Sequence, residues 1–120
     1  MDHGQVRLIL STVDSDEAAL RLSRLWVESH RAACVTRIAG AASVYSWQGE
    51  LQEESEILLL IKTSVGDEDE LASLLESFAA DHPYDEPELL VFAADGGAKG
   101  YLRWILQWRN AVGDSKEGGA

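Results

Sequence analysis

The chain has 120 residues, of which 46% are hydrophobic and 26% are charged. This is the composition of one globular domain, and it excludes both extensive disorder and a second ordinary domain. Ten Lys and Arg against 21 Asp and Glu give a formal net charge of −11, and such an acidic surface makes nucleic acid and membranes unfavourable partners.

The first quarter of the chain predicts a strand and then a helix. Residues 5–13 are rich in β-branched and aliphatic types, which favours a strand. Asp14 lies three residues before Glu17, a spacing that resembles a capping box and predicts a helix start. Apolar residues then recur at helical spacing, so a helix is expected over 15–30.

The middle of the chain predicts a long hairpin. Residues 33–47 have the pattern of a strand, and Gly40 marks a bulge or a bend because glycine otherwise weakens a strand. A turn is expected at 48–49, before a second long strand whose clearest part is 57–63. A strand of about 15 residues is roughly 50 Å long, so the hairpin should project beyond its own domain.

The last third predicts a helix, a strand and a final helix. An i, i+3, i+4, i+7 apolar stripe indicates a helix that ends at His82, since the residue before a proline avoids the helical region. A fourth strand is expected over 87–94 and a third helix over 98–110. Residues 1–112 would form a single domain, and the polar, glycine-rich residues 113–120 a flexible tail.

This order, β-α-β-β-α-β with an added C-terminal helix, predicts an α+β fold of the ferredoxin-like class. The third strand is apolar on both faces, with Leu58 and Leu60 on one and Leu59 and Ile61 on the other. The two crossover helices cover only one face, so either the third helix or other subunits must cover the second. Because a projecting hairpin also exposes strand edges, a homo-oligomer is expected.

A dense polar segment, from His82 to Glu88, lies between the second helix and the fourth strand. It holds an imidazole, a phenol and three carboxylates around two prolines, and imidazole and carboxylate are ligands that Cu²⁺ and Zn²⁺ accept. The alternative is a connector whose acids are simply solvated. The candidate metal ligands in this segment are His82, Asp85, Glu86 and Glu88.

Other side chains have both a functional and a structural interpretation. Cys34 could bind a soft ion as a thiolate, or serve as a small buried hydrophobe. Lys62 ends an apolar strand, where a cation either marks a site or reaches for water. Tyr45 and Trp47 share a strand face and could form one wall of a cleft or pack in an interface. A single cysteine excludes an internal disulfide and fits a reducing compartment, so a cytoplasmic location is expected.

Enzyme motifs do not occur in the sequence. There is no GxGxxG, no Walker A sequence and no GxSxG, and no serine has the context of a nucleophile. No signal peptide and no apolar run of about 18 residues is evident, so export and membrane insertion are not expected. His3 and His30 have no polar companions and are expected at the surface.

Five segments together resemble the CutA divalent-cation tolerance proteins. They occur in the order and spacing of that family and cover most of residues 6–108. The segments are RAACV (Arg31–Val35), SVYSWQGE (Ser43–Glu50), ESEILLLIKT (Glu54–Thr63), HPYDEPE (His82–Glu88) and YLRW (Tyr101–Trp104). Each is weak alone, and the five together are highly specific.

The resemblance implies a ferredoxin-like fold and a tight homotrimer in which long hairpin strands pair between subunits. It also implies a link to tolerance of copper and other divalent ions, with copper binding proposed and no catalytic activity firmly established. CutA trimers resemble those of PII signalling proteins, which have clefts between subunits.

The chain departs from the family pattern next to its candidate ligands. By position, the family's cysteine is Cys34, and its HPY motif begins at His82. Thr36 stands where Asn is usual, and Asp85 and Glu86 stand where glutamate and a small or β-branched residue are usual. These changes leave the fold assignment intact but alter the geometry expected of a metal site.

The sequence therefore predicts a non-enzymatic, cytoplasmic homotrimer that binds divalent ions such as copper or zinc. His82 would be the main ligand, with the three carboxylates that follow it, and Cys34 a softer second candidate. The alternative is a PII-like signalling or scaffold protein that binds a small ligand in inter-subunit clefts lined by Trp47, Lys62 and Tyr84. An enzyme with an unrecognised hydrolytic cleft ranks last, since no nucleophile stands out.

Overall fold

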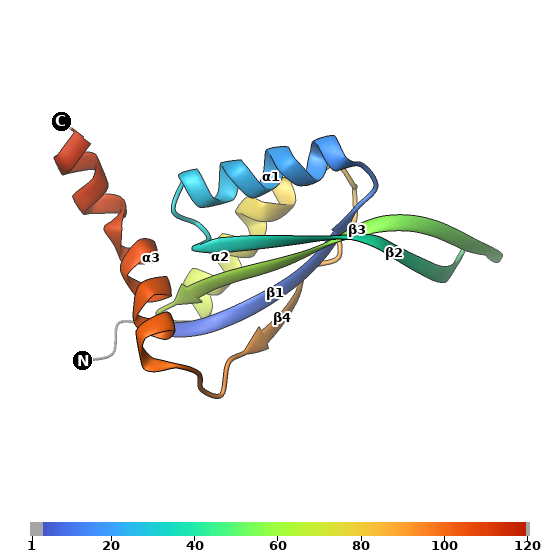
Figure 1. Cartoon of the computed structure of the whole chain (residues 1–120). Helices are drawn as coiled ribbons and strands as arrows, with labels where there is room; N and C mark the ends of the chain where they lie inside the picture. Colours follow the sequence, from blue (N-terminus) through green and yellow to red (C-terminus); the bar gives the residue numbers. More distant parts are fainter. Residues whose placement is uncertain (1–3, 120) are drawn as a thin grey trace.

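The computed structural model describes residues 4–119, with side chains described through Ala111. Within this range four strands and three helices follow one another in the predicted order (Figure 1). In chain order they are β1 (Gln5–Val13), α1 (Asp16–Glu28), β2 (Cys34–Trp47), β3 (Glu50–Val65), α2 (Glu68–Asp81), β4 (Leu90–Ala93) and α3 (Lys99–Gly119). None of these helices is long and apolar enough to cross a membrane. The flexible tail predicted over residues 113–120 lies beyond the last described side chain, Ala111. Its flexibility therefore stays a prediction.

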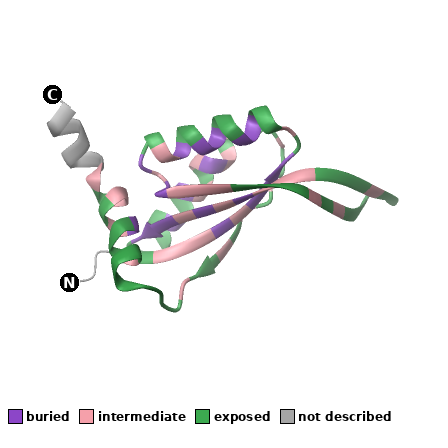
Figure 2. Cartoon of the chain, in the orientation of Figure 1, coloured by how far each residue is buried: buried purple, intermediate pink, exposed green. Residues whose placement is uncertain are grey.

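The strands form one antiparallel sheet in the order β2-β3-β1-β4. Helices α1 and α2 cover the same face of this sheet (Figure 1), and Trp26 of α1 packs on Phe78 of α2 with ring centroids 4.4 Å apart. Between the helices and the sheet lies the hydrophobic core, coloured purple in Figure 2. This is the predicted ferredoxin-like arrangement.

Side chains cap the first two helices. Ser15 Oγ accepts a hydrogen bond from the N–H of Ala18 at 3.1 Å, so Ser15 and not the predicted Asp14 is the N-cap of α1. In α2, Asp67 accepts from the N–H of Glu70 at 2.8 Å, as its spacing requires. Both caps satisfy N–H groups that the first helical turn leaves without partners. The carboxylate of Asp14, one residue too early for capping, is left exposed.

The β2–β3 hairpin projects beyond the rest of the molecule, whose longest dimension is 49 Å (Figure 1). Its turn consists of Gln48 and Gly49, with φ of 52° and 80°. Two successive residues in the left-handed region match the twist of a tight hairpin. Gly40, with φ of 86°, lies at the register shift between Ile38 and Ala41, which confirms the predicted bulge.

The sheet face opposite α1 and α2, here called the open face, is uncovered in the described part of the chain. On β3, Leu59 and Ile61 point toward the helices and are fully buried, whereas Leu58 and Leu60 point to the open face. The expectation that the third helix might cover this face is wrong, because α3 packs across one end of the sheet through the buried Ile105 (Figure 1). Large apolar side chains of the open face that are 43 to 54% exposed are Ile38, Leu90 and Phe92.

His30 is buried between the end of α1 and α3 and connects the two helices, whereas a surface position was expected. It is 8% exposed, its ring stacks on Trp108 at 3.8 Å, and its Nδ1 lies 2.8 Å from the carbonyl oxygen of Trp108. Trp108 Nε1 donates to the carbonyl of Val27, and Arg109 donates to that of His30. Sequence reasoning missed these contacts because the partners are about 80 residues apart. His3 lies outside the described residues.

Replacing Trp108 by alanine is expected to lower the free energy of unfolding by about 2 kcal/mol, since the half-buried indole provides both the stack on His30 and a hydrogen bond. Urea denaturation at a fixed protein concentration measures this. The matched control is Trp104→Ala, because Trp104 is 45% exposed on the same helix and should matter little. An equal decrease in the free energy of unfolding in the two variants would contradict the proposed stabilising role of the contacts of Trp108.

Candidate functional site

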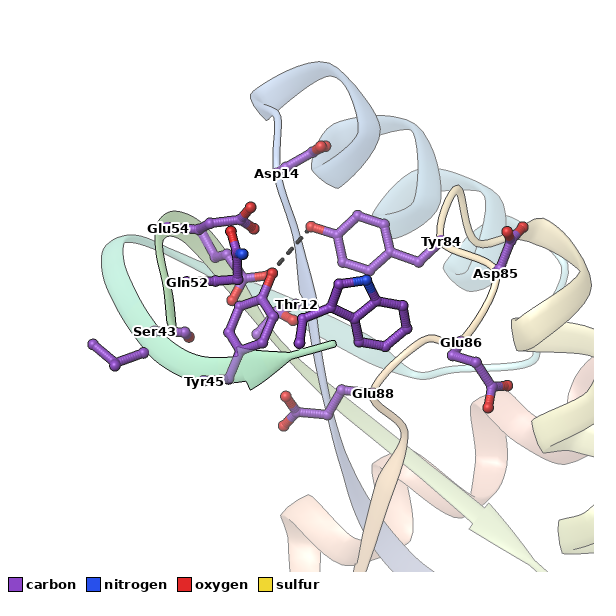
Figure 3. A pocket seen from close by; sticks show the side chains of 13 residues that line it. Thr12, Asp14, Ser43, Tyr45, Gln52, Glu54, Tyr84, Asp85, Glu86 and Glu88 are labelled. Carbon is purple, nitrogen blue, oxygen red and sulfur yellow. Dashed lines mark hydrogen bonds between the residues drawn. The ribbon is translucent and has the colours of Figure 1, made fainter. Parts of the chain in front are cut away.

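A cleft of about 890 Å³ opens between the outer part of the β2–β3 hairpin and the loop that joins α2 to β4 (Figure 3). Aromatic side chains from two elements line it, namely Tyr45 and Trp47 of β2 and Tyr84 of the loop. We call it the acidic cleft because of its carboxylates. These are Asp14, Glu54, Glu56, Asp85, Glu86 and Glu88.

The described lining residues of the acidic cleft carry a concentration of negative charge. None of the described residues that line it is Lys, Arg or His. A concave surface with charge of one sign concentrates the potential and raises the local concentration of counter-ions, here cations. Among the described residues, however, no three His, Cys, Asp or Glu side chains come close enough together to hold a metal ion. One chain therefore presents a cation-attracting groove and not a finished coordination site.

Tyr84 ties the two walls of the cleft together. Its hydroxyl donates a hydrogen bond to Glu56 Oε2 at 3.2 Å, between the loop and β3 (Figure 3). Burial, together with the negative charge of Asp14 and Glu56, raises the pKa of Tyr84 well above its ordinary value. The pKa of Tyr45 is raised too, by partial burial and by Glu54. Both phenols therefore stay protonated and neutral at physiological pH.

His82 lies beneath the cleft rather than in its lining, and it is only 7% exposed. Its Nδ1 accepts the N–H of Tyr84 at 3.1 Å, and its Nε2 lies 3.0 Å from the carbonyl oxygen of Thr12 and 3.1 Å from Ser11 Oγ. A carbonyl can only accept, so Nε2 carries the proton. Both nitrogens of the expected main ligand are thus used within the fold, where they position Thr12 and Tyr84, two residues of the cleft lining.

The loop carboxylates that the sequence predicts as metal ligands line the cleft. Of the three residues predicted to bind a small ligand, only two line it. Trp47 and Tyr84 line the cleft, whereas Lys62 does not. Lys62 lies six residues along β3 from Glu56, which is about 20 Å in a strand. There its Nζ is 3.9 Å from Cys34 Sγ and 3.1 Å from the Oγ1 of Thr36. Cys34 is therefore remote from the cleft carboxylates, and no single site in the described part of one chain contains both.

Comparison with known proteins places this fold and cleft in a family. The family described as CutA1 divalent ion tolerance protein matches residues 7–108. This chain belongs to the CutA1 family. The divalent-cation tolerance protein CutA of Pectobacterium atrosepticum is 43% identical over 98 residues, which is 82% of this chain and 86% of that protein. CutA of Thermus thermophilus is 39% identical over 100 residues, 83% of this chain and 94% of that one.

Solved structures of CutA1-family proteins agree with the fold. The crystal structure of CutA from Xylella fastidiosa has a TM-score of 0.81 and 37% sequence identity, and the match covers 88% of this chain and 99% of that one. The structure of CutA1 from Oryza sativa has a TM-score of 0.79 at 36% identity, and the match covers 87% of this chain and 93% of that one. The ferredoxin-like architecture predicted from the sequence is therefore confirmed, and the names of the bacterial relatives describe tolerance of divalent cations and no reaction.

In this CutA1-family chain, sequence reasoning missed three acids of the cleft: Asp14, Glu54 and Glu56. Glu54 and Glu56 stand two residues apart on a strand, so their shared face was a usable signal. The spacing around Asp14 predicts a helix cap, and only the fold places the end of β1 beside a loop 70 residues later. The acidic cleft is thus larger and more negative than the HPYDEPE segment alone indicates.

Proposed function

We propose that this CutA1-family chain acts in the cytoplasm as a homotrimer that binds divalent metal ions of the copper and zinc type and contributes to metal tolerance, without catalysing a reaction. The observation that supports this most directly is the acidic cleft, whose described lining combines six carboxylates with no basic side chain. The family assignment supports the link to divalent cations.

The carboxylates of the loop are the proposed inner ligands. Glu86 and Glu88 lie on either side of Pro87. Asp85 directly precedes Glu86, so it lies between the two prolines, Pro83 and Pro87. A loop with fewer accessible conformations loses less entropy when it holds an ion. Carboxylate oxygens bind many divalent ions, and Cu²⁺ is held tightest among the first-row ions at a given site. Because the described part of one chain brings no three ligands together, we expect weak binding unless a second copy contributes ligands.

Glu86→Gln and Glu88→Gln are each expected to weaken binding of Cu²⁺ and Zn²⁺ about thirtyfold, since a unit charge about 4 Å from a doubly charged ion contributes ~2 kcal/mol in water. Isothermal titration calorimetry of the assembled protein measures this. Glu28→Gln is the matched control, because Glu28 is exposed on α1 and does not line the cleft.

His82→Gln should bind these ions like the unmodified protein, because both ring nitrogens are engaged within the fold. If His82→Gln abolishes metal binding while Glu86→Gln and Glu88→Gln do not change it, the imidazole is the ligand. Our assignment of the ligands to the carboxylates would then be wrong. If Glu28→Gln weakens binding as much as Glu86→Gln, the effect is one of net charge and not of the cleft.

The proposed homotrimer is supported by the open face and the hairpin. Exposed leucine, isoleucine and phenylalanine side chains on a sheet face are unfavourable in water, and burying one contributes about 1.5–3 kcal/mol. The outer edge of β2 is unpaired along the projecting hairpin in the described chain, and such an edge can pair with another chain. Other copies of the same chain would satisfy both requirements.

The second candidate, a PII-like protein that binds a small ligand, is favoured by one observation. Tyr45, Trp47 and Tyr84 give the cleft aromatic walls, which an ion of the size of Zn²⁺ does not need. The carboxylates disfavour a phosphate-bearing ligand, and the cation expected to recognise one, Lys62, lies elsewhere. A small ligand of this cleft should therefore be cationic.

A further inference from the structure

We propose that the β2–β3 hairpin of one copy docks on the end of the open face at Lys62 in the next copy, where glutamates of the hairpin pair with the Lys62 ammonium group. The inference rests on the proposed homotrimer. It goes beyond it in naming the segment of one copy and the surface of the next that meet.

Lys62 is the one basic residue of the described strands that points to the open face. Side chains alternate along β3, so Lys62 lies on the same side as Leu60. The other two basic residues of the strands point to the helix side. Arg7 forms an ion pair with α2, and Arg37 lies opposite the buried Leu59. The open face therefore has a positive charge at a single place in the described strands.

The ammonium group of Lys62 is held in place but not neutralised by a carboxylate. Its Nζ donates a hydrogen bond to Thr36 Oγ1 at 3.1 Å and lies 3.9 Å from Cys34 Sγ. None of the ion pairs within the described chain includes Lys62. A copy that covers the open face takes this charge out of water, which is unfavourable unless an opposite charge pairs with it. The surface that covers Lys62 must therefore carry carboxylates.

The outer part of the hairpin has the side chains that this surface requires. Residues 38–61 include four glutamates and no lysine or arginine. Glu50 and Glu54 stand an even number of residues from Lys62 on β3, so they lie on the same side of the strand. The hairpin also presents Trp47, which is 58% exposed, and an indole can cover apolar side chains of the open face beside the cation.

Only a second copy can bring the hairpin glutamates to Lys62. Glu54 is eight residues and Glu50 twelve residues from Lys62 along one continuous strand, which is about 26 Å and 40 Å. The hairpin points away from the sheet end where Lys62 lies (Figure 1). A contact between two different surfaces of the same chain is head to tail, and it closes into a ring when the rotation between copies allows it. Three such contacts would form the proposed homotrimer.

Lys62→Glu tests the contact, because it places like charges opposite each other. Light scattering over a dilution series should show a dissociation constant raised about tenfold or more. Adding Glu50→Lys and Glu54→Lys to the same chain restores opposite charges and should restore assembly. Arg37→Glu is the matched control, because it reverses the charge of an exposed residue on the helix side and should leave assembly unchanged. Should circular dichroism show that Lys62→Glu is unfolded, Lys62→Gln is compared with Arg37→Gln instead.

Weaker assembly of the Lys62 variant than of the Arg37 variant, restored in Lys62→Glu by the two hairpin substitutions, would support the proposal. Equal assembly of the Lys62 and Arg37 variants, or a loss that the hairpin substitutions do not restore, would overturn it. The unmodified chain judges the homotrimer separately. A trimer whose assembly Lys62→Glu leaves unchanged removes this contact alone, whereas a mass of one chain at every concentration removes the homotrimer itself.

Discussion

Leu90→Asp is expected to convert the proposed homotrimer into a monomer at concentrations where the unmodified chain is fully assembled. Leu90 is 54% exposed on β4, where it points to the open face opposite Leu10 of β1. In an assembly that covers this face, an aspartate would be buried without a partner, and an unpaired buried charge costs several kcal/mol. Dissociation constants should therefore rise by at least about a hundredfold.

Sedimentation velocity or light scattering over a dilution series measures the change. The matched control is Leu20→Asp, because Leu20 is 39% exposed on the outer side of α1 and takes the same change in charge and size. Leu20→Asp should remain a trimer. A mass equal to one chain for the unmodified protein at all concentrations would remove the homotrimer, and a trimer in both variants would place the interface elsewhere.

Acidification below pH 6.5 is expected to destabilise the protein through His82. Burial lowers the pKa of His82 below its ordinary value of 6.5, and the opposing effects of the Thr12 carbonyl and Asp14 are smaller. Above pH 6.5 the imidazole is neutral in both folded and unfolded chains, so its contribution is fully present. Below pH 6.5 the unfolded chain takes up the proton first, and the free energy of unfolding falls until the pH passes the folded pKa.

Protonation also has a structural consequence at this histidine. The imidazolium has a proton on Nδ1, which then faces the N–H of Tyr84 donor to donor. The contact that positions the loop is lost, so cation binding at the cleft should weaken over the same pH range. Chemical denaturation and Zn²⁺ titration between pH 5 and pH 7.5 would follow the two effects in parallel.

His82→Gln separates the histidine from the many carboxylates that titrate in acid. An amide is neutral at every pH used and can still accept from one group and donate to another, so the variant should lose the stability slope below pH 6.5 that the unmodified protein shows. His82→Ala leaves the Tyr84 N–H and the Thr12 carbonyl without their partner and should cost about 2–4 kcal/mol at pH 7.5. Identical pH profiles for the unmodified protein and the His82→Gln variant would contradict the assignment to His82.

The predictions for Leu90→Asp and for His82 concern two features of the fold, the open face and the acidic cleft. The open face must be covered for its apolar side chains to leave water, and the acidic cleft lies along the outer part of the hairpin that projects from that sheet. If other copies pair with the hairpin as proposed, they approach Tyr45 and Trp47 as well. Measuring cation binding in the Leu90→Asp monomer would therefore show whether one chain suffices for the cleft.

The sequence by itself determined the order of the elements, the β2–β3 hairpin with its turn at Gln48 and Gly49, and the two apolar faces of β3. These features depend on local rules: apolar periodicity, the φ angles that turn residues accept, and side chains that alternate along a strand. The HPYDEPE segment indicated a loop whose carboxylates line the cleft. Their role as metal ligands stays a prediction.

Only the tertiary structure decided which of the candidate residues share a site. His82 turns inward to Ser11 and Thr12, some 70 residues away in the chain, while Lys62, with Cys34 beside it, lies about 20 Å along β3 from Glu56 of the cleft. Residue type and spacing cannot distinguish an imidazole bonded within the fold from one that is free to bind a ligand. That difference depends on which backbone groups the folded chain brings to its two nitrogens, and such groups come from segments far apart in the sequence.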